Sequence, residues 1–183
     1  MRRLFSFPNP VNEISARLVA AGVVIMTLPV IVVGYFGPSL GISPRASDDA
    51  WWLLVVLAYG FWARVLTGPK LSPLGLLVTR VLTPALNRPP KEVPGPPKRF
   101  AQGMGVAFST TAAVLALGFE QYGAATIVLA MLLAAATLES VFAICLGCQV
   151  FKLLMRVGLV PEEVCLECND IWARPRVTAG ASS

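Results

Sequence analysis

Four long apolar stretches constrain the fold of this chain more than any other feature of its sequence. They cover about residues 16–36, 50–66, 102–119 and 124–145, and each approaches the length of about 20 residues that a helix needs to cross a bilayer. The chain is 56% hydrophobic and only 14% charged, which is too apolar for an ordinary soluble domain. The sequence therefore predicts an all-α, polytopic membrane protein with four transmembrane helices.

The connections divide the chain into a transmembrane domain, residues 1–157, and a short tail, residues 158–183. Apolar residues between Leu74 and Ala85 repeat at helical spacing in the connection between the second and third stretches. This spacing predicts an amphipathic helix that lies at the membrane interface. The proline-rich residues 88–98 after it are predicted to be extended, because proline cannot donate a helical hydrogen bond.

The basic residues predict how the chain is oriented in the membrane. Consecutive spans cross the membrane in opposite directions, so every second connection lies on the same side. Fourteen of the fifteen Lys and Arg residues fall on one of these two sides. Arg45 alone falls on the other side. Because Lys and Arg are enriched in cytoplasmic loops, we expect a multi-pass protein of the inner (plasma) membrane with both termini in the cytoplasm. The bilayer is its expected partner, and nucleic acid is not, because the basic residues form no continuous patch.

All four cysteines lie near or after the end of the last apolar stretch, as two C-x-x-C pairs, Cys145 with Cys148 and Cys165 with Cys168. Histidine is absent from the chain, which excludes mixed Cys/His metal sites and the commonest general base. A reducing cytoplasm disfavours permanent disulfides. Three interpretations remain for the four thiols: redox or sulfur exchange, a structural four-cysteine zinc site, or inert packing residues.

The environment predicted for the first cysteine pair contains opposing electrostatic effects. The fourth helix is expected to run through Cys145 and to continue to Val157. Lys152 lies four residues after Cys148, so on a helix its charge would favour the thiolate. The negative end of the helix dipole would oppose it. The predicted catalytic residues are the four cysteines and Lys152.

Glu139 places a carboxylate inside the last apolar stretch, where a charged group costs about 2.5–3.5 kcal/mol to insert. Arg17, Arg64 and Gln102 lie at the same predicted end of the bundle, so Glu139 is expected to meet them. The cluster is interpreted either as a structural ion pair, as a site for a polar headgroup, or as a proton relay for thiol chemistry.

Four segments of the sequence, listed here, also resemble a known family: Phe7-Pro-Asn-Pro-Val-Asn-Glu13, Arg64-Val-Leu-Thr-Gly-Pro-Lys-Leu-Ser-Pro73, Pro94-Gly-Pro-Pro-Lys-Arg-Phe-Ala-Gln-Gly103 and Leu138-Glu-Ser-Val-Phe-Ala-Ile-Cys-Leu-Gly-Cys148. They are similar to the DUF4395 family of bacterial membrane proteins over most of residues 5–160. Members of that family accompany thioredoxin-like and rhodanese-like sulfurtransferase proteins, so the resemblance implies a soluble partner of one of these kinds. The four-helix architecture is also similar, by analogy and without a sequence match, to that of disulfide-bond formation protein B and vitamin K epoxide reductase, which implies a quinone as a candidate cofactor. The cytoplasmic side predicted for the cysteines of this chain departs from the pattern of those two proteins.

These observations lead to two hypotheses of different classes. In the first, the chain is the membrane component of a thiol-redox or sulfur-handling system, and its C-x-x-C pairs exchange electrons or sulfur with a soluble partner as in a thiol-disulfide oxidoreductase. In the alternative, it is a non-enzymatic membrane scaffold in which Cys145, Cys148, Cys165 and Cys168 bind a structural zinc ion.

Overall fold

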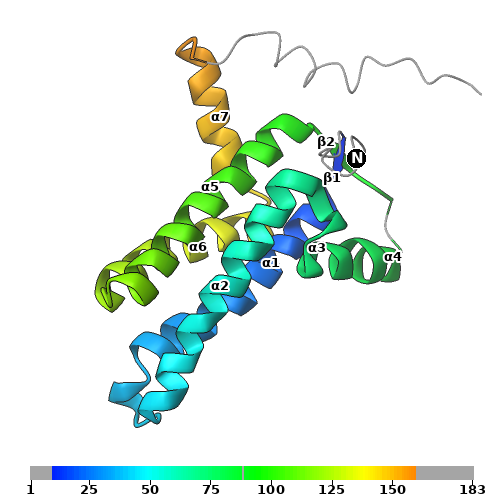
Figure 1. The fold of residues 1–183 in the computed structure, drawn as a ribbon. Helices are drawn as coiled ribbons and strands as arrows, with labels where there is room; N and C mark the ends of the chain where they lie inside the picture. Colours follow the sequence, from blue (N-terminus) through cyan, green and yellow to red (C-terminus); the bar gives the residue numbers. More distant parts are fainter. Residues whose placement is uncertain (1–9, 88, 160–183) are drawn as a thin grey trace, which may run out of the picture.

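The computed structural model describes residues 10–87 and 89–159, and it is helical apart from one pair of two-residue strands (Figure 1). Among the described residues, four helical segments are long and apolar enough to cross a membrane: Glu13–Tyr35, Pro44–Ala85, Gly95–Gly118 and Tyr122–Phe142. The prediction of an all-α protein with four such helices is confirmed. The architecture is that of a multi-pass membrane protein.

The first spanning segment consists of α1 (Glu13–Pro29) and the π-helical turn η1 (Val30–Tyr35). The Asn12 side chain caps α1 by accepting a hydrogen bond from the Ile14 N–H at 3.0 Å. Pro29 has no N–H to donate, and the hydrogen-bonding pattern changes from α to π directly after it. A short 3₁₀ turn, η2 (Pro38–Leu40), then leads to the second segment.

The second segment begins with α2 (Pro44–Thr67), earlier than predicted, because Ser43 caps it and Pro44 fits its first turn. Gly68 adopts a positive φ of 68° and ends α2. Short helical pieces follow: η3 (Gly68–Lys70), α3 (Pro73–Leu77), η4 (Val78–Leu82) and α4 (Thr83–Ala85). Figure 1 shows α3 and α4 turning away from the bundle, so the amphipathic helix predicted here exists, and its place at a membrane interface stays a prediction.

The third segment corrects the prediction that residues 88–98 are extended throughout. Strand β2 (Glu92–Val93) is extended and pairs antiparallel with β1 (Val11–Asn12), but α5 (Gly95–Ala113) begins directly afterwards. Pro96 and Pro97 lie in its first turn, where backbone N–H groups have no helical partner and proline costs nothing. Lys98 is therefore helical and buried. The segment ends with the π-helical turn η5 (Val114–Gly118).

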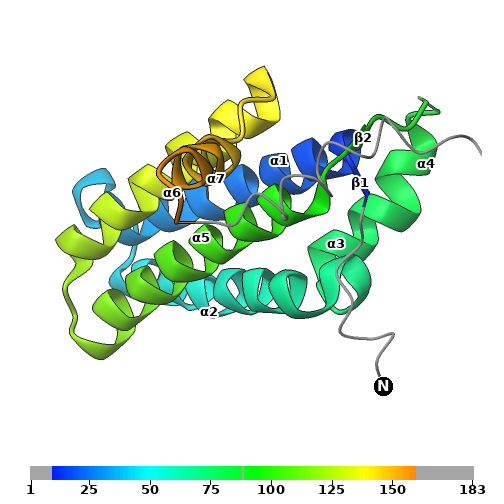
Figure 2. The same ribbon diagram turned by 90° about the horizontal axis from the view of Figure 1, so that it is seen from above.

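The fourth segment corrects a second prediction, that one helix runs through Cys145 to Val157. Helix α6 (Tyr122–Phe142) ends before the cysteines, because Ala143 takes a left-handed conformation with φ of 58°. A separate helix, α7 (Leu146–Arg156), begins after Cys145. Figures 1 and 2 show α7 projecting from the end of the bundle at a marked angle to α6.

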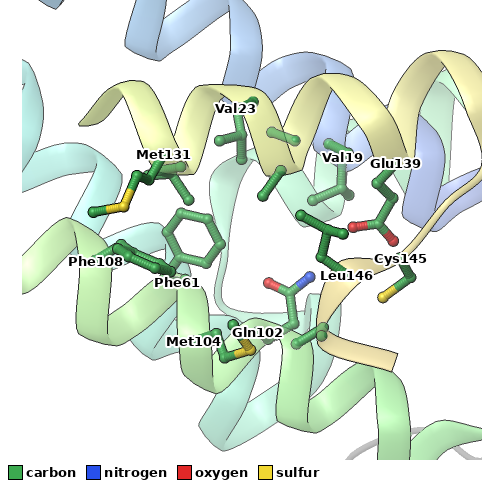
Figure 3. Close-up of a pocket in the computed structure, with 18 residues that line it drawn as sticks. Val19, Val23, Phe61, Gln102, Met104, Phe108, Met131, Glu139, Cys145 and Leu146 are labelled. Carbon is green, nitrogen blue, oxygen red and sulfur yellow. The ribbon is translucent and has the colours of Figure 1, made fainter. Parts of the chain in front are cut away.

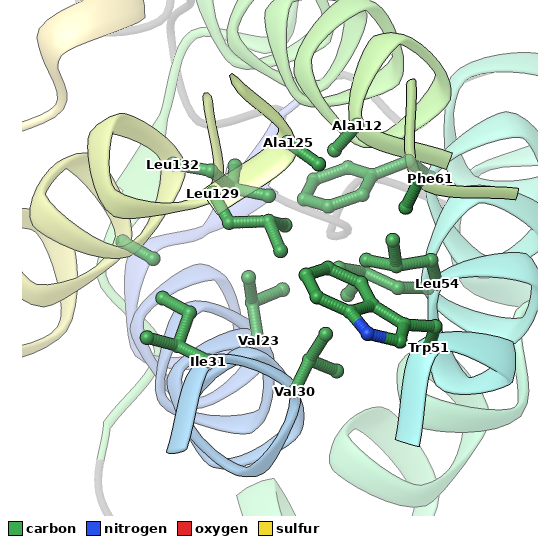
Figure 4. Close-up of a cluster of buried hydrophobic side chains, with 13 residues drawn as sticks. Val23, Val30, Ile31, Trp51, Leu54, Phe61, Ala112, Ala125, Leu129 and Leu132 are labelled. Atoms are coloured by element: carbon green, nitrogen blue, oxygen red, sulfur yellow. The ribbon is translucent and has the colours of Figure 1, made fainter. Parts of the chain in front are cut away.

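The four spanning segments form a bundle in which α1 packs on α6, α6 on α5, and α5 on α2. Its core is apolar and draws on all four segments (Figure 4), with these residues buried: Val23, Val30, Ile31, Trp51, Leu54, Leu57, Phe61, Ala112, Ala116, Ala125, Leu129, Leu132 and Ala136. Many large apolar side chains, such as Ile25, Trp52 and Ile127, are instead more than 60% exposed. Such an outer surface fits contact with lipid.

Candidate dithiol site

The first cysteine pair lies at the junction of α6 and α7, where Cys145 acts as the N-cap of α7. Its sulfur accepts a hydrogen bond from the backbone N–H of Cys148 at 3.3 Å. The Cys148 thiol also donates to it, with 2.6 Å between the two sulfur atoms. Both cysteines are free; Cys145 is buried and Cys148 is partly exposed. Two thiols in contact can form a disulfide with little movement of the chain.

The electrostatics of this junction favour a thiolate on Cys145. The hydrogen bond from the Cys148 thiol is the main cause that lowers the pKa of Cys145, and Lys98 adds a smaller effect in the same direction, whereas burial and the Glu139 carboxylate act in the opposite direction. The same hydrogen bond, together with burial, raises the pKa of the Cys148 thiol. Because Cys145 precedes α7, the positive end of that helix dipole adds to the effect. The prediction that a helix C-terminus opposes the thiolate is therefore wrong, for the reason that the helix breaks at Ala143.

Arg17 holds the chain where α6 ends. Its guanidinium donates to the Ser140 carbonyl through Nε at 3.1 Å and Nη2 at 3.0 Å, and to the Val141 carbonyl at 3.0 Å. These carbonyls belong to the last turn of α6 and lack helical donors. The Ile144 N–H bonds back to the Leu138 carbonyl at 3.1 Å. Arg17 thus serves as a capping residue of α6, and its hydrogen bonds go to these carbonyls, not to Glu139.

Helix α7 is seated closely against α5 beside the thiols. A Cβ atom at Gly147 would lie 2.5 Å from the Cβ of Ala101 and 2.6 Å from its Cα, so this contact requires glycine. One turn later the rings of Phe100 and Phe151 pack with their centroids 5.6 Å apart. The glycine inside the C-L-G-C motif therefore has a structural explanation, which is that it lets the dithiol approach α5.

Lys98 is the partner of Glu139, and the sequence did not reveal it. Its Nζ lies 2.6 Å from Glu139 Oε1, and the two side chains are only 11% and 16% exposed. The positive charge of Lys98 also acts to lower the pKa of both the Cys145 and the Cys148 thiol. Lys152, which was predicted to favour the thiolate, lies on the exposed side of α7. The available signal was the Pro-Pro pair before Lys98, which fits the first turn of a helix as well as an extended chain.

The residues predicted to meet Glu139 lie near the same end of the bundle, but their hydrogen bonds go to other partners. Arg64 and Gln102 do meet, with Arg64 Nε donating to Gln102 Oε1 at 2.9 Å. Arg64 is buried, donates from Nη1 to the Ser72 hydroxyl at 3.3 Å, and lies 4.4 Å from the centroid of the Phe61 ring. Glu139 pairs with Lys98 instead.

A cavity of about 400 Å³ opens beside Cys145, between α1, α2, α5, α6 and the start of α7 (Figure 3). Most of its lining is apolar, and Gln102, Glu139 and Cys145 contribute polar atoms at one end. Its lining residues are Val19, Ala20, Val23, Phe61, Ala101, Gln102, Met104, Gly105, Phe108, Met131, Leu132, Ala134, Ala135, Ala136, Glu139, Cys145, Leu146 and Gly147. Cys148 is not among them. The two thiols therefore face different surroundings.

The second predicted pair, Cys165 and Cys168, lies outside the residues that the structure describes. Within residues 10–87 and 89–159, no group of three or more His, Cys, Asp and Glu side chains is arranged to hold a metal ion. The described part of the chain thus contributes two sulfur ligands to the four that the zinc hypothesis requires.

A family model described as "Domain of unknown function (DUF4395)" matches residues 11–156. The match includes the seven α-helices and two strands of the residues that the structure describes, together with the Cys145–Cys148 junction. It ends before Cys165 and Cys168. No curated protein and no solved structure matches the sequence.

Proposed function

We propose that this chain, which belongs to the DUF4395 family, is the membrane component of a thiol-redox or sulfur-handling system that works with a soluble partner. The observation that supports this proposal is the sulfur–sulfur contact of 2.6 Å between Cys145 and Cys148. One of the two thiols, Cys145, stands at the N-terminus of α7, and its pKa is lowered mainly by the hydrogen bond from the Cys148 thiol. Inert packing cysteines need neither feature.

The different surroundings of the two sulfurs suggest different roles. Cys145 is buried at the cavity, and its lowered pKa makes it the better leaving group. Cys148 is the more exposed sulfur and is the one that a soluble protein can reach. Exchange with a partner therefore passes through Cys148.

When the chain holds a Cys145–Cys148 disulfide, a thiolate of the partner attacks the Cys148 sulfur. The disulfide breaks, its electron pair leaves on Cys145 as a thiolate, and a mixed disulfide joins Cys148 to the partner. The second thiol of the partner then attacks the partner's sulfur in the mixed disulfide. The partner is left with an internal disulfide, and Cys148 is released and takes up a proton. Two electrons pass from the partner to this chain, and the reverse sequence returns them.

Trapping of the intermediate tests the proposal. In a full chain carrying Cys165→Ser and Cys168→Ser, oxidised glutathione should convert the reduced protein to the Cys145–Cys148 disulfide. Adding Cys145→Ser should stop the reaction at a glutathione adduct on Cys148, measured by mass spectrometry. Adding Cys148→Ser instead should give much slower adduct formation, because Cys145 is buried.

The alternative hypothesis makes a different prediction for the same protein. A purified wild-type chain that holds one zinc ion, with its thiols unreactive until a chelator removes the metal, would favour the scaffold. Free thiols that do not react with oxidised glutathione in either form would contradict the exchange proposal outright.

A further inference from the structure

We propose that the cavity beside Cys145 binds a membrane-soluble quinone, and that this quinone accepts the two electrons that reach the dithiol. The inference rests on the proposed function, and it names the second reaction partner of the same site. Its evidence is the shape of the cavity, the polar groups at one end, and the position of Cys145 among them (Figure 3).

The size and walls of the cavity fit a quinone with an apolar tail. Its volume of about 400 Å³ falls in the range of small-molecule sites. The rings of Phe61 and Phe108 and the side chain of Met131 line the end away from Cys145, where they suit the apolar tail of a quinone whose ring lies beside the sulfur.

The polar end presents a hydrogen-bond donor held by its neighbours. Gln102 accepts from Arg64 through Oε1, so its carbonyl oxygen is engaged and its NH₂ group is left to donate toward the cavity that it lines. A carbonyl oxygen is the matching acceptor. Glu139 and a Cys145 thiolate at the same end disfavour an anionic ligand, because Lys98 is already paired with Glu139. A neutral carbonyl compound is thus preferred over a fatty acid or a phosphate.

The cavity lies between helices that can cross the membrane, which favours a ligand delivered from the bilayer. Met131 on its wall is 49% exposed, and Ala134 next to it is also exposed on the outer face of α6. An apolar quinone can enter from lipid there, whereas Cys148 is partly exposed and lies outside the cavity lining.

The redox step balances between the dithiol and the quinone. The Cys145 thiolate adds to a ring carbon and forms a C–S bond. The Cys148 thiol loses its proton and attacks the Cys145 sulfur, so that an S–S bond forms and the C–S bond breaks. The electron pair of that bond stays on the ring. The Cys145 thiolate and the Cys148 thiol have then lost two electrons and one proton, and the ring takes up these together with one proton from water to become a quinol.

Single-turnover reduction of a short-chain ubiquinone, which carries one isoprene unit, tests the inference. The full-length protein in lipid nanodiscs is reduced, freed of reductant and mixed with the quinone, and the loss of quinone absorbance is followed together with formation of the Cys145–Cys148 disulfide. We expect one quinol for each disulfide formed. Exchange with oxidised glutathione is measured on the same sample in a separate reaction.

Two cavity variants and one matched control locate the site. Ala135→Leu fills part of the cavity, and Gln102→Glu keeps an acceptor for Arg64 but replaces the donor that faces the ligand. Each should weaken quinone binding about tenfold, the effect of one lost hydrogen bond or of steric overlap. Ala130→Leu places the same side chain on the exposed face of α6, away from the cavity, and should behave as wild type.

The outcomes separate this inference from the proposed function. Exchange with glutathione without quinol formation overturns the quinone inference and leaves the proposed function standing. Absence of both reactions overturns both. Quinone that binds without being reduced, or that binds equally to wild type and Ala135→Leu, overturns the assignment of the cavity as the site. Stoichiometric quinol with loss in both cavity variants supports it.

Discussion

Replacement of Cys148 by alanine should make Cys145 a weaker acid. The change removes the thiol that donates to the Cys145 sulfur, which is the largest cause of its lowered pKa. A hydrogen bond to a charged group is worth about 1.5–3 kcal/mol, and one pKa unit corresponds to about 1.4 kcal/mol. Because a thiol is a weak donor, the lower end applies, so the change destabilises the Cys145 thiolate by about 1.5 kcal/mol and the pKa of Cys145 should rise. Below that pKa, the thiolate fraction falls about tenfold.

The assay is the rate of alkylation of Cys145 by iodoacetamide across a range of pH, in full chains that also carry Cys165→Ser and Cys168→Ser. The thiolate fraction rises as the pH rises through the pKa of Cys145, so a lowered pKa places the midpoint of the profile at lower pH. Cys148→Ala should move the midpoint to higher pH. Cys148→Ser is the matched control, because a hydroxyl still donates. Identical profiles for the two variants would refute the reasoning.

Three further changes test the surroundings of the thiols. Gly147→Ala should slow formation of the Cys145–Cys148 disulfide about tenfold, because its Cβ overlaps Ala101. The control Gly103→Ala on α5 meets nothing within 4 Å and should leave the rate unchanged. Equal rates for the two variants would contradict the close packing of α7 against α5. Lys98→Met should lower the free energy of unfolding by about 3 kcal/mol, since it leaves the Glu139 carboxylate unpaired, and adding Glu139→Gln should recover most of this loss. Chemical unfolding measures both variants. Unchanged stability of Lys98→Met would show that the ion pair does not stabilise the fold. Arg17→Met should increase hydrogen exchange at the end of α6, and unchanged protection there would show that the cap is dispensable.

The four spanning segments were predictable because a bilayer demands long apolar runs, and the sequence contains them. The same reasoning placed Arg64 and Gln102 at one end of the bundle, but it had both meeting Glu139, and their contact with each other was not predicted. Helix boundaries were less predictable. Pro96 and Pro97 suit an extended chain and the first helical turn equally well, so the start of α5 and the burial of Lys98 were missed.

The break between α6 and α7 had no local signal at all. Neither glycine nor proline marks it, and the residue with a left-handed conformation there is Ala143. The carbonyls freed at this point are satisfied by Arg17, which is more than 120 residues away in the chain. Only the tertiary structure places these groups together, and it thereby converts Cys145 from the end of one helix to the beginning of another.

A redox titration of the purified full-length chain tests the central claim most directly. The protein is equilibrated with mixtures of reduced and oxidised glutathione, and the peptide that contains Cys145 and Cys148 is assayed for its disulfide by mass spectrometry. The account predicts reversible two-electron formation of that disulfide, with the same midpoint approached from the oxidised and the reduced protein. Thiols that stay reduced at every ratio, or a disulfide that forms only irreversibly, would contradict it.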